Sequence, residues 1–435
     1  MTFMEASFGK RPDSKKNDAD RSQNVPTSLF SLANVRSYKD ETSIELSRIN
    51  LIFGANSAGK STLSKSIMAL AELRDPRSFK DLVSARIRFL GPLRGNRLNL
   101  FEAALGSSME SLSYSGSSDA LYCSVSVEDL AFSDISDFKV ELRLRPSKTQ
   151  PFISVRLLTD GVPLAEWNAR DGSVTPAGKA AVEHIRSELG IKKSTSESLL
   201  GSLEKISASV NSLSPESFTA ADLVRAVLAE GLGESPRYTR DTAPAGEIKR
   251  MRSASSDVNR LIREMGSTIR VANPRAESEY QLFDEANGLV LGLDQVGSGT
   301  GQMVAVANRI SRASTKSAEH KRFGSGRYPL ALIQEPEAHL HPRKQADIGE
   351  VICRQAITHP MRLLIETHSD ALLFRCLKLI RRGIIDHDAM RVIYVEQAQD
   401  GTSTARNLRI GEDGALIDPF PVGFLDWGLE DLLGQ

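Results

Sequence analysis

The stretch Ile49-Asn-Leu-Ile-Phe-Gly-Ala-Asn-Ser-Ala-Gly-Lys-Ser-Thr62 decides the fold class of this chain. It begins as an almost continuous apolar run, which is typical of a strand in a sheet that is buried on both faces. Residues 54–61 then match the pattern G-x-x-x-x-G-K-[ST] at every position. A helical apolar stripe follows from Lys60 to about Arg74, and no proline interrupts it. A strand, a glycine loop and a helix in this order predict a phosphate-binding loop.

Each residue type in this loop has a chemical reason. The glycines let the backbone curl around a phosphate chain with its N–H groups pointing inward, and the helix that follows offers its positive end to the same phosphates. Lys60 adds a charge that reaches the outer phosphates, and the Ser61 hydroxyl can complete the shell of a Mg²⁺ ion. The residues expected to hold the nucleotide are Gly54, Ala55, Asn56, Ser57, Ala58, Gly59, Lys60, Ser61 and Thr62.

Composition narrows the function classes. The chain has 435 residues, with 55 Lys and Arg against 55 Asp and Glu, so its net charge is zero and any nucleic-acid site must be a local patch. The three cysteines are scattered, which fits a reducing compartment and gives no zinc pattern. We find neither a signal peptide nor a run of eighteen apolar residues, so we expect a cytoplasmic protein that does not contact the membrane.

The sequence divides into four parts. Residues 1–26 are polar and are expected to form a disordered tail. Residues 27–170 form a first lobe with the phosphate loop and a β-rich subdomain, and residues 171–245 have the spacing of a helical insertion. Residues 246–435 form a second lobe in which strands alternate with helices, which predicts an α/β fold with a mostly parallel sheet. Ahead of the phosphate loop we expect two strands, over Leu29–Arg36 and Ser43–Phe53.

The second lobe contains three further polar segments, each next to a predicted element. Glycine-rich residues 297–301 precede a helix and can bind an anion. The predicted strand 330–334 delivers Gln334 and Glu335 at its carboxyl end, where open α/β sheets place their ligands. The strand 362–366 leads to His368 in the same way. Glu335 can polarise an attacking water or help to hold a metal, and His368 can sense a γ-phosphate.

Together these motifs resemble the OLD-type ATPases, which belong with RecF and SMC heads in the ABC-ATPase superfamily. The segments that carry the resemblance are Asn34-Val-Arg-Ser-Tyr38, Phe53-Gly-Ala-Asn-Ser-Ala-Gly-Lys-Ser-Thr62, Val296-Gly-Ser-Gly-Thr-Gly-Gln302, Glu335-Pro-Glu-Ala-His-Leu-His-Pro342 and Glu366-Thr-His-Ser369. The resemblance covers about 28–75 and 246–435. It implies an ABC-type ATPase head, in which a β-rich lobe joins a mostly parallel sheet flanked by helices, with ATP and Mg²⁺ as cofactors. It also implies ATP hydrolysis, which we expect to be slow because the amide of Gln334 carries no negative charge for the metal.

The resemblance also assigns roles. Residues 54–62 become the Walker A loop, Glu335 the catalytic glutamate, His341 the D-loop residue and His368 the switch histidine, with Lys60 as a further catalytic group. The signature loop would contact a nucleotide held by a second copy. The residues that complete the nucleotide site are then Arg36, Gly297, Ser298, Gly299 and Gln302. We therefore expect Gly299→Glu to block ATP-dependent dimers and to leave nucleotide binding by the monomer intact.

Two departures from the family pattern stand out. Gln334 occupies the position of the Walker B metal carboxylate, and an amide adds no negative charge. We expect Ser61, Gln334 and Glu335 at the metal, with Glu335 or Glu337 compensating for the missing charge. In addition, no glutamine lies between Lys60 and Gln150, so the glutamine loop is either at Gln150 or lost.

The resemblance implies an ATP-driven homodimer or higher oligomer that regulates a prokaryotic antiphage defence system. Little chain follows Ser369 and it lacks paired acidic clusters, so we expect the effector, such as a nuclease, to be a separate partner. Residues 249–275 are basic, which favours a solvated helix face; the alternative is contact with a DNA backbone, so DNA is a further candidate partner. The alternatives are a RecF-like DNA repair ATPase and a nucleotide-gated scaffold that hardly hydrolyses ATP.

Overall fold

The computed structural model describes residues 25–73, 113–114, 119–128, 137–145, 152–159, 162–168, 224, 227–229, 231–234, 256–272, 281–292, 295–322 and 328–419. The expected tail, apart from Val25 and Pro26, lies outside these residues, as do Gln150 and most of the predicted insertion. The predicted domain boundaries therefore stay predictions.

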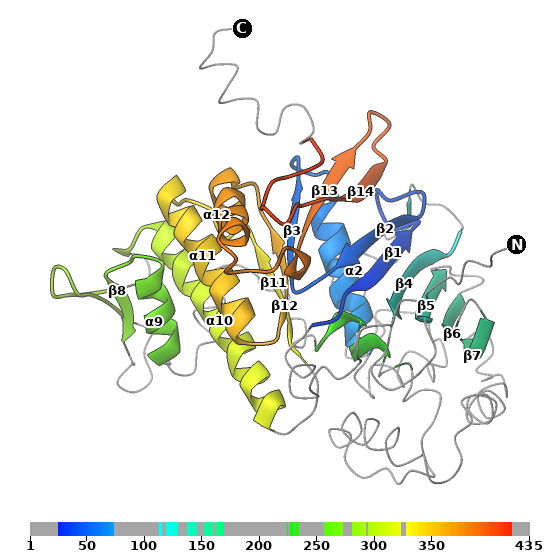
Figure 1. Ribbon diagram of the computed structural model, residues 1–435, viewed down its shortest axis with the longest axis horizontal. Coiled ribbons are helices and arrows are strands. Elements are labelled where there is room, and N and C mark those ends of the chain that lie inside the picture. Colours follow the sequence, from blue (N-terminus) through cyan, green and yellow to red (C-terminus); the bar gives the residue numbers. More distant parts are fainter. Residues whose placement is uncertain are drawn as a thin grey trace, which may run out of the picture.

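A five-stranded sheet forms the centre of the molecule (Figure 1). Its order is β11 (Leu330–Gln334), β12 (Arg362–Glu366), β3 (Ile49–Gly54), β13 (Met390–Gln397) and β14 (Ser403–Leu408). The first four strands are parallel and β14 is antiparallel to β13. The expected α/β class with a mostly parallel sheet is confirmed. Because parallel strands share a direction, the residues that follow β11, β12 and β3 meet at one edge.

Both faces of this sheet are covered, which explains the continuous apolar run in β3. Ile52 faces one core, while Leu51 and Phe53 face the other. Helix α2 (Lys60–Glu72) packs on the first face, and a group of helices packs on the second (Figure 1). These helices are α9 (Ser256–Glu264), α10 (Ser298–Arg322), α11 (Pro342–Thr358) and α12 (Asp370–Arg381).

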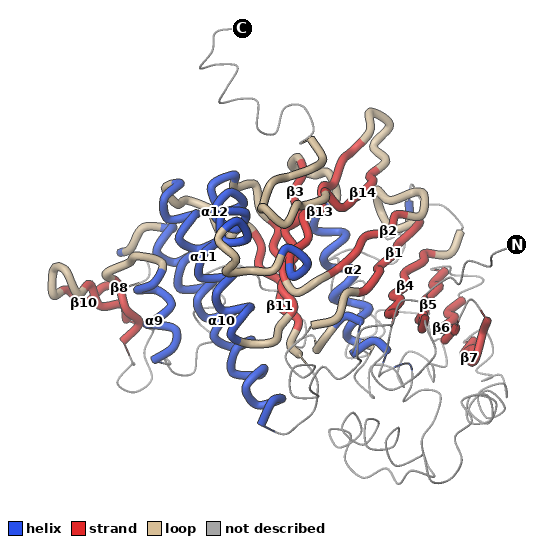
Figure 2. The backbone as a smooth tube through the Cα atoms, viewed as in Figure 1, coloured by secondary structure: helices blue, strands red, loops and turns tan. Residues whose placement is uncertain are grey.

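A second sheet lies on the far side of α2 and is antiparallel (Figure 2). Its order is β2 (Thr42–Leu46), β1 (Ser28–Ala33), β4 (Leu121–Glu128), β5 (Asp137–Arg145), β6 (Phe152–Thr159) and β7 (Val162–Asn168). Buried residues such as Phe30 and Leu32 share one core with α2. Thr159 pairs with Val162, so β6 and β7 form a hairpin. The β-rich lobe of the first half is therefore present.

A small third sheet packs beside α9. It consists of β8 (Ile269–Ala272), β9 (Gln281–Asp284) and β10 (Leu289–Leu291), and a turn at Asn287-Gly288 joins the last two. No helix among the described residues is both long enough and apolar enough to cross a membrane.

Two boundary predictions were wrong. The segment Ser43–Phe53 is two strands in different sheets, because the buried Asn50 side chain makes a turn: it accepts from Ser47 N and donates to Ser47 O, both at 2.8 Å. The glycine-rich residues 297–301 are not an extended loop either. Helix α10 already begins at Ser298, so most of this segment is the first helical turn.

Candidate nucleotide-binding site

The phosphate loop leaves β3 at Gly54 and enters α2 at Lys60. Gly54, Ser57 and Gly59 have φ of 148°, 64° and 110°. A Cβ atom at Gly54 would collide with the backbone oxygen of Val395 on β13, so this position requires glycine. Lys60 Nζ donates to Gly54 O at 2.8 Å and to Ala55 O at 2.7 Å. The ammonium group therefore lies across the mouth of the loop.

Neighbouring segments hold the far end of the loop. Tyr38 Oη donates to Gly59 O at 3.2 Å, and Ser403 Oγ donates to Ala58 O at 2.6 Å. Ser403 N also donates to Ser37 O at 2.7 Å, which ties the turn before β2 to β14. This turn carries Arg36, with φ of 50°, next to the loop. Burial lowers the pKa of Arg36.

A buried carboxylate that the sequence analysis missed faces the start of α2. Glu366, the last residue of β12, is only 3% exposed. Its Oε2 accepts from Ser61 Oγ at 2.5 Å, and its Oε1 accepts from Gln334 Nε2 at 2.9 Å and from Ser64 Oγ. The available signal was an acidic residue at the end of an apolar strand. We had assigned no role to it.

The residues after β11 contribute Gln334 and Glu335. The Gln334 amide is engaged with Glu366, while the Glu335 side chain is exposed and its backbone has φ of 44°. Burial lowers the pKa of Lys60, and the charges of Glu366, Glu335 and Glu337 act in the opposite direction. The structure thus brings Lys60, Ser61, Gln334 and Glu335 to one edge, together with Glu366.

Glu337 holds the segment that carries His368. Its carboxylate accepts from Thr367 Oγ1 at 2.8 Å and from His368 N at 2.5 Å. Burial raises the pKa of Glu337. From the sequence we expect Glu335 or Glu337 to compensate for the negative charge that Gln334 lacks. In the structure, the carboxylate beside Ser61 belongs to Glu366.

The His368 imidazole lies near enough to this edge for the charges there to act on it. Burial lowers its pKa, as does the positive charge of Lys60, and Glu335 raises it. Its Nε2 atom is buried and has no hydrogen-bond partner among the described residues. A neutral imidazole with an unsatisfied nitrogen suits a histidine that contacts a ligand.

The start of α10 packs on the segment that follows β11. Gln302 Nε2 donates to Glu335 O at 2.6 Å, and Ser298 is exposed. Gly299 is buried, and an added Cβ would lie 2.7 Å from His339 O. Gly299→Glu would therefore disturb the packing within one chain. For this reason it cannot block dimers selectively while leaving nucleotide binding by the monomer intact, contrary to the expectation from the sequence. Among the described residues other than its chain neighbours, none has an atom within 4 Å of a Cβ added at Gly297.

The remaining sequence candidates have local roles. His341 caps α11 by accepting from Arg343 N at 3.3 Å. In the basic segment, Arg260 pairs with Glu264 at 2.7 Å and Arg270 with Glu285 at 3.3 Å. These two pairs favour the solvated-face interpretation. Arg263, also on α9, is exposed, and the segment's remaining basic residues at 249, 250, 252 and 275 lie outside the described part of the chain.

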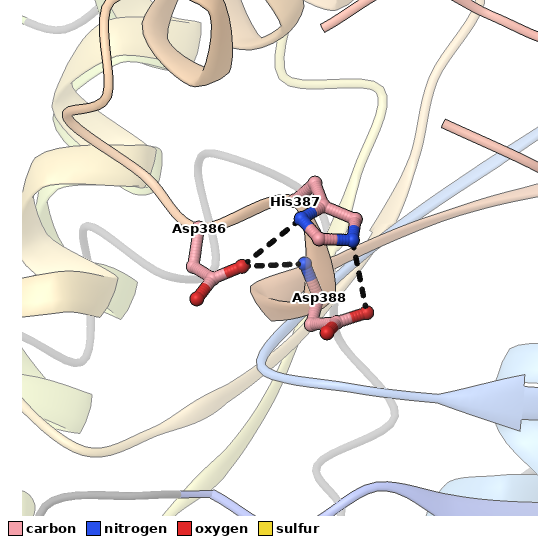
Figure 3. A group of neighbouring side chains, drawn as sticks. All are labelled: Asp386, His387 and Asp388. Carbon is pink, nitrogen blue, oxygen red and sulfur yellow. Dashed lines mark hydrogen bonds and ion pairs between the residues drawn. The ribbon is translucent and has the colours of Figure 1, made fainter. Parts of the chain in front are cut away.

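Among the described residues, one group has ligand atoms close enough together to hold a metal ion: Asp386, His387 and Asp388 (Figure 3). It lies at the 3₁₀ helix η5 (His387–Ala389), before the amino end of β13 and at the opposite edge of the sheet from the phosphate loop. Asp386 Oδ1 accepts from Asp388 N at 3.1 Å as the cap of that turn. Capping accounts for this arrangement, and the group is separate from the site.

Comparison with known families agrees with this geometry. The family described as "AAA domain, putative AbiEii toxin, Type IV TA system" matches residues 214–373, and a second AAA domain family matches residues 30–72. Both matches are to families of AAA-type ATPase domains. The first match spans Glu335 and His368, and the second spans the phosphate loop. No curated protein matches the sequence significantly.

The overall arrangement is similar to that of SMC heads. The Smc head bound to the C-winged helix domain of ScpA has 14% identity and a TM-score of 0.44, with 88% of this chain and 98% of that chain covered. The Thermotoga maritima SMC head has 13% identity and a TM-score of 0.39, with 88% and 100% covered. The Smc head from Pyrococcus furiosus with an extended coiled coil has 14% identity and a TM-score of 0.44, with 88% and 96% covered.

Proposed function

We propose that the protein binds ATP with Mg²⁺ and hydrolyses it at the carboxyl edge of the parallel sheet. The observation that carries this proposal is the placement of Lys60 Nζ across the loop, 2.8 Å from Gly54 O, with Ser61, Glu335 and His368 at the same edge. A glycine loop at a helix start binds phosphates through backbone N–H groups, and the lysine neutralises their charge.

Different residues of the chain bind the phosphates, accept the proton and donate to the γ-phosphate. Lys60 and the loop amides bind the β- and γ-phosphates, and Glu335 accepts a proton from the attacking water as the bond between the γ-phosphorus and the bridging oxygen breaks. His368 Nε2 donates to the γ-phosphate. The donor set fits Mg²⁺, because the Ser61 hydroxyl and a buried carboxylate with no ion-pair partner among the described residues lie together. When bound, the ion would neutralise charge that develops on the phosphates.

The test is Lys60→Ala against Lys65→Ala, which removes a lysine from the same helix one turn away. We expect Lys60→Ala to show no ATP binding where the wild type saturates, and Lys65→Ala to bind as the wild type does. Equilibrium dialysis with labelled ATP measures both. Unchanged affinity in Lys60→Ala would reject the site.

We also propose that a second copy completes the site with Gly297, Ser298, Gly299 and Gln302. The exposed Ser298 at the start of the long helix α10 supports this, since its neighbouring N–H groups suit a γ-phosphate. We expect Ser298→Glu to bind ATP as a monomer and to lose ATP-dependent dimers, because the added carboxylate repels the phosphates. Ala318→Glu, at an exposed position on the same helix, should dimerise normally. Light scattering with and without a non-hydrolysable ATP analogue distinguishes the two.

At the level of biology, we propose that this ATPase is the regulatory subunit of a prokaryotic antiphage defence system and acts with a separate effector, such as a nuclease. The resemblance to OLD-type ATPases and the matched family description support this role. Purification from its own cells with and without ATP, followed by mass measurement, tests it. A complex containing only DNA-repair proteins would favour the RecF-like alternative instead.

A further inference from the structure

The carboxyl edge of the sheet lacks an acid at the expected strand but contains one on the neighbouring strand. In phosphate-loop enzymes Mg²⁺ is held by the loop Ser or Thr and by an acid at the end of a nearby strand. Here β11 ends with Gln334, whose amide carries no charge. Strand β12 ends with Glu366, and the register pairs these two residues directly.

Glu366 is the nearer of the two to the phosphate loop. Strand β12 lies between β11 and β3, so its last residue is one strand closer to the strand that leads into the loop. The contact follows from this position: Glu366 Oε2 accepts the hydrogen bond of Ser61 Oγ at 2.5 Å. Ser61 is the loop hydroxyl expected at the metal, so the carboxylate and the hydroxyl are already adjacent.

The residues that contact Glu366 do not neutralise its negative charge, so the carboxylate can bind a cation. Its hydrogen-bond donors are the neutral groups of Ser61, Ser64 and Gln334, and no Lys or Arg of the described residues forms an ion pair with it. The charges of Lys60 and Glu366 act on each other, but the two groups form no ion pair, and a carboxylate that is only 3% exposed is costly without a cation in direct contact. A divalent ion beside Ser61 would supply that missing partner.

We propose that Glu366 is the metal-binding carboxylate of this site and that Gln334 is a positioning residue that orients it through its amide. The acid and the amide have exchanged strands relative to the usual arrangement. Gln334 suits its position because an acid there would lie against Glu366, and two carboxylates at hydrogen-bond distance repel each other. This inference rests on the proposed ATP site and names its metal ligand.

The experiment uses the full-length chain and two readouts. Binding of a non-hydrolysable ATP analogue in EDTA reports the phosphate loop without metal. Binding of Mn²⁺ to the analogue-loaded protein, followed by electron paramagnetic resonance, reports the metal site. We compare the wild type, Glu366→Gln, and the control Glu141→Gln, which removes a buried carboxylate from the antiparallel sheet.

We expect Glu366→Gln to bind the analogue in EDTA as the wild type does, because no phosphate contact is removed. Its Mn²⁺ affinity should fall about tenfold to a hundredfold, while Glu141→Gln retains the wild-type value. Wild-type Mn²⁺ affinity in Glu366→Gln overturns the inference and leaves the ATP site standing. Loss of analogue binding in EDTA by Glu366→Gln also overturns it, since Glu366 would then support the loop. A wild type that binds no analogue rejects the proposed function itself.

The reciprocal exchange tests the role of Gln334. In the double variant Gln334→Glu with Glu366→Gln, the charge returns to β11 and the amide moves to β12. We expect Mn²⁺ affinity to recover at least in part relative to Glu366→Gln alone. A double variant no better than the single one would show that Gln334 has no positioning role. Thermal unfolding of each variant without nucleotide confirms that the chains are folded.

Discussion

The two edges of the parallel sheet use the same residue types in opposite ways. At the carboxyl edge, Glu366 and Glu337 are buried and contact the phosphate loop and the His368 segment. At the amino edge, Asp386 and Asp388 are exposed on either side of His387, and Asp386 caps a short turn (Figure 3). The comparison teaches that a compact group of acids and a histidine does not make a site by itself. Burial and connection to a ligand-binding loop distinguish the first edge from the second.

The largest expected difference between the edges is in stability. Gly54→Ala would force a side chain against the backbone of Val395, which cannot move without disrupting β13. We expect it to lower the free energy of unfolding by about 3 kcal/mol or more. Gly383 precedes the amino end of β13, and its φ of 65° faces open space. Gly383→Ala should therefore lose only about 1–2 kcal/mol, the cost of its backbone conformation. Urea unfolding measures both, and equal losses would contradict the close approach at Gly54.

The second difference concerns the two histidines. His368→Ala removes the proposed donor to the γ-phosphate, and we expect kcat for ATP hydrolysis to fall about a hundredfold. His387→Ala alters only the exposed turn and should leave kcat unchanged. Phosphate release under saturating ATP provides the measurement. If His387→Ala hydrolyses ATP as slowly as His368→Ala does, the proposal that the catalytic groups lie at the carboxyl edge would be contradicted.

The pH dependence of stability gives a third contrast, centred on Glu337. Burial raises the pKa of this carboxyl above its ordinary value of 4.5, so the folded chain binds its proton more tightly than the unfolded chain does. The stability that this proton contributes is present below pH 4.5 and is lost as the pH rises through the folded-state pKa. A glutamine does not ionise, so we expect Glu337→Gln to become more stable relative to the wild type as the pH rises through the folded-state pKa of Glu337.

Asp388→Asn is the control for this third contrast, because it removes one negative charge from the exposed edge. Urea unfolding at several pH values from 4 upward, in the same buffers, follows both variants against the wild type. A constant stability difference between Glu337→Gln and the wild type at every pH would show that Glu337 does not titrate in this range.

The smallest expected effect separates the paired arginines from a nucleic-acid surface. Arg260 is half exposed and pairs with Glu264 on one helix face, an arrangement that contributes a few tenths of a kcal/mol at most. We expect Arg260→Gln to change neither stability nor retention on a DNA column at 150 mM salt by a measurable amount. A clear loss of retention would support the DNA interpretation of the basic segment.

Most of the central sheet was predictable because its signals are local. Each of these signals depends only on the residues of one short segment. Examples are the apolar run before Gly54 and the alternation of strands and helices after residue 329; outside this sheet, the turn at Asn287-Gly288 is another. The division of Ser43–Phe53 into two strands was not predictable. The Asn50 side chain makes the turn between them, and nothing in the apolar pattern indicates that turn. The packing of Gly299 on His339 was also not predictable, because nothing in the glycine-rich pattern shows that these two segments meet.

The sequence by itself determined the phosphate loop, the order of the elements around it and the list of polar residues at strand ends, because these depend on the spacing along one short stretch of chain. Only the tertiary structure decided which of those residues meet. Strand order places β12 between β11 and β3, so the carboxylate beside Ser61 is Glu366 rather than a residue after β11. Sequence spacing carries no information on which strands are neighbours, since hydrogen bonding between distant segments fixes that order during folding.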